Sequence, residues 1–184
     1  MRFGSAEHLD AWRAYGAYPR IHDAIFRVII TEMMGTRVLD LGCCYGLLAQ
    51  RVLRQAGIKL AIGVDADAKA ISAGAAAGIG AELLSLEVNE ASLPQLIAMV
   101  TRHKIDVLIA RRVLPELFGG HPELGRRFAT EMRGAGIREV FLEGRVATAK
   151  AVNPLSSIEA EVEMLSAGFR EVQRVGAVSY LRAL

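Results

Sequence analysis

Short apolar runs alternate along this chain with longer segments in which apolar residues return every third or fourth position. The longer spacing is typical of an amphipathic helix, and a short continuous run is typical of a strand buried on both faces. The first amphipathic segment runs from Ile21 to Met33, and Gly35 is expected to end it. Runs predicted to be strands follow at 38–41, 60–65, 81–86, 105–110 and 136–144.

Helices are predicted between these runs, at 47–54 and 93–100, and at two further places that carry starting signals. Asp67 can cap an alanine-rich helix, and Pro122 fits the first turn of another. Near the end of the chain a helix is expected up to Gly168, and a strand begins at Phe169. This alternation predicts an α/β fold, a doubly wound parallel sheet with helices on both faces.

Length, composition and cysteine content indicate the number of domains and the location of the protein. The chain has 184 residues, 52% of them hydrophobic, which fits one domain and permits a homodimer or a protein partner. We expect residues 1–34 to form a helical lid segment and residues 35–184 a cofactor-binding core. The two cysteines are adjacent, so the sequence predicts no disulfide, no metal site and a cytoplasmic location. No stretch resembles a secretion signal or a membrane span.

The most informative motif lies where the first strand meets the next helix, within Val38–Ala49. Gly42 and Gly46 allow the backbone to turn sharply there, but the third glycine of a dinucleotide-binding turn is missing. That absence disfavours a nicotinamide-binding oxidoreductase. The second strand ends in Asp65, and a carboxylate at that position is the usual partner of two ribose hydroxyls. A buried Asp40 would need hydrogen bonds from loop amides or from a ligand amine.

These residues resemble the first motif of the class I, Rossmann-like S-adenosylmethionine-dependent methyltransferases, which reads roughly Asp-Leu-Gly-Cys-Gly-x-Gly. Asp40–Cys43 and Gly46 match it, Asp65 matches the acid of the second strand, and Cys44 stands where the family most often has glycine. The stretches 104–117 and 136–144 resemble the fourth and fifth strands of the family. The resemblance runs from about residue 21 to 184. It implies a seven-stranded, mostly parallel sheet that closes with a C-terminal antiparallel β-hairpin.

The resemblance also implies the roles of individual residues toward S-adenosylmethionine. Asp40 would contact the amino group of the methionine moiety, and Asp65 would bind the ribose hydroxyls. Glu87 or Val88 would reach the adenine. The complete set of residues implied to bind the cofactor is Asp40, Gly42, Cys43, Cys44, Gly46, Asp65, Ala66, Glu87, Val88, Ala110 and Arg111.

Candidate catalytic residues follow the fourth strand. Arg111 could grip an anionic acceptor, and because consecutive strand residues point in opposite directions, at most one of Arg111 and Arg112 should face the site. Glu116 and His121 are candidate bases there, and His8, Tyr15 and Tyr18 could belong to the lid. Their structural alternatives are ion pairs, packing and surface positions.

Motifs that are absent narrow the acceptor. The Asn-Pro-Pro-Tyr motif of amino-methylating relatives and the Pro-Cys of cytosine C5 chemistry do not follow the fourth strand. The sequence therefore favours methyl transfer to an O or N of a small molecule or polymer end, and disfavours duplex nucleic acid. The alternative is a noncatalytic S-adenosylmethionine-binding subunit of a larger complex. A catalytic domain should keep an open pocket beside the methyl group, which such a subunit would fill.

Overall fold

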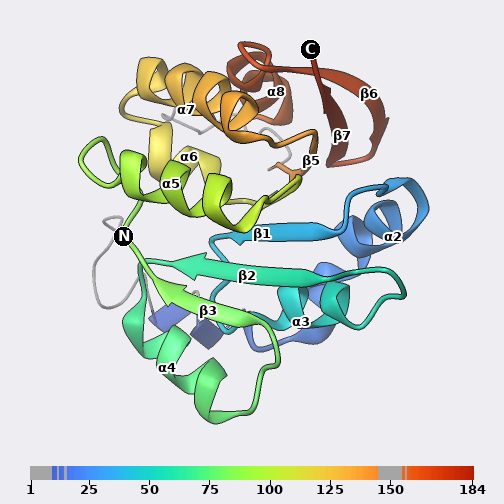
Figure 1. The fold of residues 1–184 in the computed structure, drawn as a ribbon, viewed down its shortest axis with the longest axis vertical. Helices are drawn as coiled ribbons and strands as arrows, with labels where there is room; N and C mark the ends of the chain where they lie inside the picture. Colours follow the sequence, from blue (N-terminus) through green and yellow to red (C-terminus); the bar gives the residue numbers. More distant parts are fainter. Residues whose placement is uncertain (1–9, 12, 15, 145–154, 156) are drawn as a thin grey trace.

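A seven-stranded sheet forms the centre of the computed structural model, which describes residues 10–11, 13–14, 16–144, 155 and 157–184 (Figure 1). The strand order is β3-β2-β1-β4-β5-β7-β6. In chain order the elements are η1 (Pro19–His22), α2 (Asp23–Glu32), β1 (Arg37–Leu41), α3 (Leu47–Leu53), β2 (Leu60–Asp65), α4 (Ala68–Ala76), β3 (Glu82–Ser85), α5 (Leu93–His103), β4 (Val107–Arg111), α6 (Leu114–Phe118), α7 (Pro122–Ala135), β5 (Glu139–Glu143), α8 (Ile158–Leu165), β6 (Phe169–Val175) and β7 (Val178–Ala183).

Strand direction in the sheet follows the predicted pattern. The first five strands are parallel, with β1 between β2 and β4. The hairpin of β6 and β7 adds to β5 in the antiparallel direction, and a bulge near Glu171 and Gln173 interrupts the register of the hairpin. The predicted mostly parallel sheet with a C-terminal antiparallel hairpin is confirmed.

Two apolar layers hold the helices to the sheet. Along β1 the side chains alternate, so that Val38 packs with α2 and α3 on one face while Leu39 and Leu41 pack with α5 on the other. The second face also carries α7 and α8, through residues such as Phe128 and Leu165. Strands buried on both faces are therefore apolar throughout, which is why the sequence shows continuous runs rather than alternation.

Local capping matches the sequence signals in two places and differs in a third. Asp67 caps α4 by accepting hydrogen bonds from the N–H groups of Lys69 and Ala70, and Pro122 opens α7. The helix α2, however, ends at Glu32, before Gly35. Gly35 instead allows close packing against β4, because a Cβ there would lie 2.3 Å from Cγ2 of Val107.

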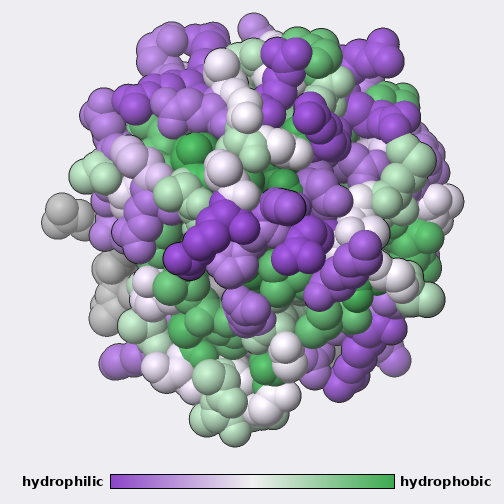
Figure 2. Space-filling model, in the orientation of Figure 1, coloured by the Kyte–Doolittle hydropathy of each residue, from purple (hydrophilic) through white to green (hydrophobic). Residues whose placement is uncertain are grey.

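Hydrophilic and hydrophobic residues are unevenly distributed over the surface of the molecule. Figure 2 shows hydrophilic side chains over the middle of one face and paler to green residues over its lower part, near the alanine-rich α4 and the edge strand β3. Among the described residues, no helix is long and apolar enough to cross a membrane.

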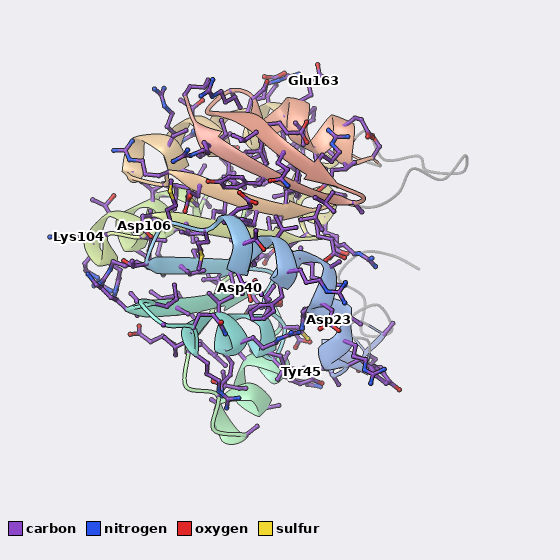
Figure 3. All side chains as sticks on the ribbon, turned by 90° about the vertical axis from the view of Figure 1, so that its right-hand side faces the viewer. Asp23, Asp40, Tyr45, Lys104, Asp106 and Glu163 are labelled. Atoms are coloured by element: carbon purple, nitrogen blue, oxygen red, sulfur yellow. The ribbon has the colours of Figure 1, made fainter. Side chains whose placement is uncertain are left out.

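Two carboxylates fix the segment that enters the sheet from α2. Glu139 is buried and accepts hydrogen bonds from the N–H groups of Met34 (3.0 Å) and Gly35 (2.8 Å) and from the hydroxyl of Tyr180 (2.6 Å). Asp106 accepts hydrogen bonds from the N–H groups of Thr36 and Arg37, which follow Gly35 in the chain. In Figure 3 Asp106 lies well apart from Asp23 and Tyr45, so these bonds are remote from the glycine turn.

We expect the Glu139→Gln variant to lose about 1–3 kcal/mol of the free energy of unfolding, because an amide group cannot accept all three hydrogen bonds of the carboxylate. Tyr180→Phe removes only one of these bonds and should lose about 1 kcal/mol. Urea unfolding followed by circular dichroism measures both. Equal stability of Glu139→Gln and the wild type would show that the cluster does not stabilise the fold.

Candidate functional site

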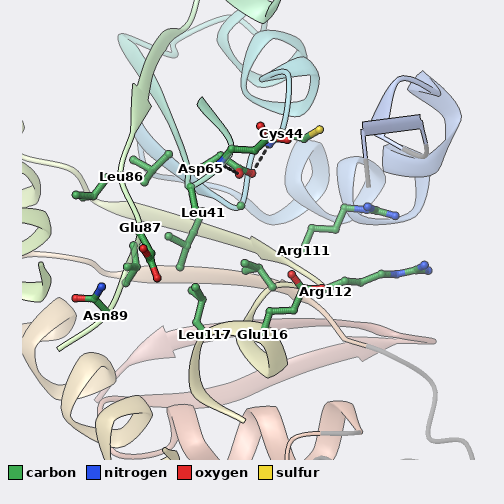
Figure 4. Close-up of a pocket in the computed structure, with 16 residues that line it drawn as sticks. Leu41, Cys44, Asp65, Leu86, Glu87, Asn89, Arg111, Arg112, Glu116 and Leu117 are labelled. Carbon is green, nitrogen blue, oxygen red and sulfur yellow. Dashed lines mark hydrogen bonds between the residues drawn. The ribbon is translucent and has the colours of Figure 1, made fainter. Parts of the chain in front are cut away.

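A cavity of about 530 Å³ opens at the carboxyl ends of β1, β2 and β4, beside the segment that follows β3 (Figure 4). Ligands of open α/β sheets bind at this edge, and the volume lies within the range of about 300–1,000 Å³ that is usual for small-molecule sites. The residues that line the cavity are Leu41, Gly42, Cys44, Val64, Asp65, Ala66, Asp67, Leu86, Glu87, Val88, Asn89, Arg111, Arg112, Val113, Glu116 and Leu117.

The turn after β1 uses most of its own hydrogen-bond donors. The N–H groups of Gly42 and Cys43 donate to the carbonyl oxygen of Val64, at 2.8 and 3.1 Å, and that of Gly46 donates to Cys43. A phosphate-binding turn needs such N–H groups to point at the ligand. The turn therefore does not offer them to a pyrophosphate, which agrees with the missing third glycine.

Asp65 joins the turn after β1 to the turn after β2. Its Oδ2 accepts the N–H of Cys44 and its Oδ1 accepts the N–H of Asp67, both at 2.8 Å. Each oxygen of an ionised carboxylate can accept two hydrogen bonds, so capacity remains for hydroxyl donors of a ligand. Asp65 lies at the wall of the cavity beside Leu41 and Leu86 (Figure 4).

Cys44 occupies a backbone conformation that explains why glycine is usual at this position in the family. Its φ is +51°, in the left-handed region. Its side chain packs against the buried Gly16, where a Cβ would lie only 2.7 Å from Sγ of Cys44. Burial, then the nearby Asp65, raises the pKa of the Cys44 thiol to about 12, so the thiol stays protonated. The departure from glycine thus places an uncharged, partly exposed side chain against Gly16.

A second, smaller cavity of about 40 Å³ lies behind the turn. Asp40 lines it, accepts the N–H of Ala49 at 3.1 Å, and is almost fully buried. Burial is the main cause that raises the pKa of Asp40 to about 7. A nearby cation would favour the ionised form of this carboxyl group. Gly42, Cys44 and Arg111 line both cavities.

Two arginines at the end of β4 share one buried carboxylate. Nε of Arg111 lies 3.2 Å from Glu143 Oε2, and Nε of Arg112 lies 3.1 Å from Glu143 Oε1. Arg111 also donates to the carbonyl oxygen of Ile21, at 3.2 Å. Glu143 therefore joins the two guanidinium groups at this end of the cavity, which Glu116 also lines.

Both arginines line the large cavity, so the expectation that at most one would face it is wrong. The alternation of strand side chains stops at the end of β4, because Arg112 has a φ of +54° and lies in the turn that follows. The side chain of Arg111 is only 8% exposed, whereas that of Arg112 is 34% exposed. Arg112 is therefore the more accessible cation.

The predicted site residues meet at this edge, with a few exceptions. Eight line the large cavity, namely Gly42, Cys44, Asp65, Ala66, Glu87, Val88, Arg111 and Glu116. Asp40 and Cys43 line the small one. Gly46 and Ala110 line neither: a Cβ at Gly46 would meet Leu83, and Ala110 is fully buried in β4.

Sequence reasoning missed several lining residues. Asp67 was expected only as a helix cap, although its carboxylate also pairs with Arg13, which brings residue 13 to the rim of the cavity.

Of the proposed lid residues, Tyr18 is 68% exposed and lines neither cavity, and His8 and Tyr15 lie outside the described residues. The described part of the chain holds no group of three or more His, Cys, Asp or Glu that could bind a metal ion.

Comparison with solved structures relates this geometry to known proteins. The bifunctional kinase-methyltransferase WbdD has 17% sequence identity and a TM-score of 0.59, over 97% of this chain and 39% of WbdD. The magnesium protoporphyrin IX methyltransferase ChlM from Synechocystis PCC 6803, solved with bound SAM, has 16% identity and a TM-score of 0.58, over 98% of this chain and 85% of ChlM. An O-methyltransferase family protein from Burkholderia thailandensis has 16% identity and a TM-score of 0.63, over 98% of this chain and 60% of that protein.

The chain has the class I methyltransferase fold. At these identities the similarity concerns the fold, and the chain spans well under half the length of WbdD. No protein-family model matches the sequence, and no curated protein sequence does either.

The contact between Gly16 and Cys44 gives a prediction about coupling. We expect Gly16→Ala to destabilise the protein by about 1–3 kcal/mol, because the new methyl group overlaps the sulfur. Cys44→Gly removes the sulfur and relieves the left-handed backbone, so Gly16→Ala should be much better tolerated in that background.

Thermal unfolding of the two single variants and the double variant measures this coupling. Gly134→Ala is the matched control, because no atom lies within 4 Å of a Cβ at that position. Additive effects of the two substitutions would contradict the packing described for Cys44.

Proposed function

We propose that this chain binds S-adenosylmethionine and transfers the methyl group to an oxygen or nitrogen of a small-molecule or polymer-end acceptor. The observation that carries the proposal is the cavity at the carboxyl ends of β1, β2 and β4, lined by Asp65 within a class I methyltransferase fold. The methyltransferase neighbours support the same class of reaction.

The chemistry of the lining residues fits this cofactor. Asp65 can accept hydrogen bonds from ribose hydroxyls, and Leu86, Val88 and Leu117 offer apolar surface to an adenine ring. The N–H groups of Gly42, Cys43 and Gly46 in the turn are already used inside the protein, which argues against a dinucleotide. Within the described residues, Nδ1 of the buried His22 has no hydrogen-bond partner, and this atom, beside the small cavity, also fits a polar end of the cofactor.

When bound, the cofactor supplies a methyl group on a sulfonium, whose displacement leaves a neutral thioether, so alignment matters more than a covalent nucleophile. The residues of this chain would bind and orient the two substrates and exclude water. Glu116, in the wall of the large cavity, would take the proton that the acceptor hydroxyl or amine loses. Arg112 would hold an anionic group of the acceptor, since its guanidinium is the more exposed of the two.

A noncatalytic cofactor-binding subunit is the competing function. Its expected mark is a filled space beside the cofactor. The large cavity instead continues from the apolar residues after β3 to Arg112 and Glu116, which favours a catalytic domain.

Isothermal titration with S-adenosylmethionine, S-adenosylhomocysteine and NAD tests the cofactor. We expect micromolar binding of the first two and none of NAD. Asp65→Ala should weaken binding at least about tenfold, because a hydrogen-bonded carboxylate is lost. Asp65→Asn keeps one acceptor oxygen at that place and should lose less. Glu163→Ala, an exposed residue on α8 and far from the site in Figure 3, is the control.

Binding of NAD alone, or no difference between Asp65→Ala and Glu163→Ala, would contradict the assignment of the cofactor.

The charge of the acceptor is tested separately, by methyl-transfer assays with pairs of acceptors. One acceptor of each pair carries a free carboxylate, and the other is its uncharged methyl ester. We expect faster turnover of the carboxylate, and Arg112→Gln should raise its KM about tenfold while leaving that of the ester unchanged. The same KM for both acceptors in the wild type would remove the anionic acceptor from the proposal.

A further inference from the structure

His22, at the end of η1, has a buried polar atom that the protein itself does not satisfy. Its side chain is only 7% exposed, and within the described part of the chain its Nδ1 has no hydrogen-bond partner. Buried polar atoms of native proteins are almost always hydrogen-bonded, so an exception calls for an explanation. His22 lines the 40 Å³ cavity together with Asp40 and Arg111, and the missing partner is expected to enter there.

The position of His22 is fixed from both sides. The carbonyl oxygen of Ile21 accepts a hydrogen bond from Arg111 in β4, and the carboxylate of Asp23 pairs with Arg51 of α3 at 2.8 Å. Arg51 in turn lies over the ring of Phe26, 4.0 Å from its centroid. The backbone on both sides of His22 is therefore held in place before any ligand arrives, which favours a preorganised binding residue.

The groups around the small cavity suit a zwitterion. Burial is the main cause that lowers the pKa of His22 to about 4, with further lowering by the nearby Arg111 and Arg51, so His22 is neutral near pH 7. A neutral imidazole still carries one N–H donor. Arg111 supplies a positive charge and Asp40 a carboxyl group. An α-amino acid carries both an ammonium and a carboxylate, and it complements this set.

The small cavity is placed to receive one end of a ligand that occupies the large one. Gly42, Cys44 and Arg111 line both, so the two spaces meet at the turn after β1 and at the end of β4. The residues suited to ribose and adenine, Asp65 and Leu86, line only the large cavity. The amino-acid end of the cofactor is the part left for the small cavity.

We propose that His22 donates a hydrogen bond from Nδ1 to the α-carboxylate of the bound S-adenosylmethionine, beside Arg111, while Asp40 faces the α-ammonium group. This inference rests on the proposed function and deepens it. It makes the segment before β1 part of the cofactor site, through a residue that no motif of the sequence indicates.

The experiment compares three ligands that shorten the amino-acid end stepwise. S-Adenosylhomocysteine has both charged groups, its decarboxylated analogue keeps only the amine, and 5′-methylthioadenosine has neither. Isothermal titration is carried out on the full chain, as wild type and as His22→Ala, His22→Asn and His121→Ala. His121 is an exposed histidine that lines neither cavity and serves as the matched control.

We expect His22→Ala to weaken S-adenosylhomocysteine about tenfold or more and to leave the other two ligands unchanged. His22→Asn carries an amide N–H near the place of Nδ1 and should restore part of the affinity. Equal weakening of all three ligands would show that His22 is only structural. Weakening of the decarboxylated analogue as well, but not of 5′-methylthioadenosine, would assign His22 to the amine and overturn the proposal.

A measurement on the wild type covers the case in which the variants do not fold. The ¹⁵N resonance of His22 Nδ1 should shift on addition of S-adenosylhomocysteine and stay in place with 5′-methylthioadenosine. A resonance that responds equally to both would overturn the proposal. If the wild type binds none of the three ligands, the proposed function fails. If it binds them and His22→Ala binds them equally well, only this inference fails.

Discussion

The geometry of the site depends on the two hydrogen bonds that Asp65 accepts. One holds Cys44 in the turn after β1, and the other holds Asp67 at the start of α4. Because Cys44 has a left-handed backbone, which a side chain disfavours, the turn needs such an external anchor. The same carboxylate lines the cavity. Shape and recognition therefore come from one side chain, and a ligand hydroxyl would meet an acceptor that is already oriented.

The segment that precedes β1 is fastened to this site at several points. Arg13 pairs with Asp67, Gly16 packs on Cys44, and the carbonyl oxygen of Ile21 accepts from Arg111. All three contacts reach residues that line the large cavity. The division into a lid of residues 1–34 and a core stays a prediction, but the described part of that segment forms a wall of the site. Opening it would break an ion pair and uncover Cys44.

The sequence predicted the parallel sheet well, because buried strands must be apolar and the turns between them need glycine or capping residues. It also placed Asp40 and Asp65, whose positions follow from where strands end. It could not place Arg112 at the cavity, since the left-handed φ of this residue leaves no periodic signal. Nor could it find His22, because a lone histidine beside an apolar helix is more often a packing residue. The fit of Cys44 to Gly16 joins positions 28 residues apart, and no pattern links them.

Carboxylates serve opposite purposes at the two ends of the sheet. Where the chain enters the strands, Asp106 and Glu139 accept backbone N–H groups and tie α2 to the sheet. Asp106 therefore belongs to the fold, although it is part of the fourth-strand pattern that resembles the methyltransferases. At the other end Asp65 keeps capacity for a ligand, and Glu143 holds Arg111 and Arg112 beside the cavity. Asp106 and Glu139 thus stabilise the fold at the end of the strands away from the cavity, and substitutions of these two residues should leave the cavity intact.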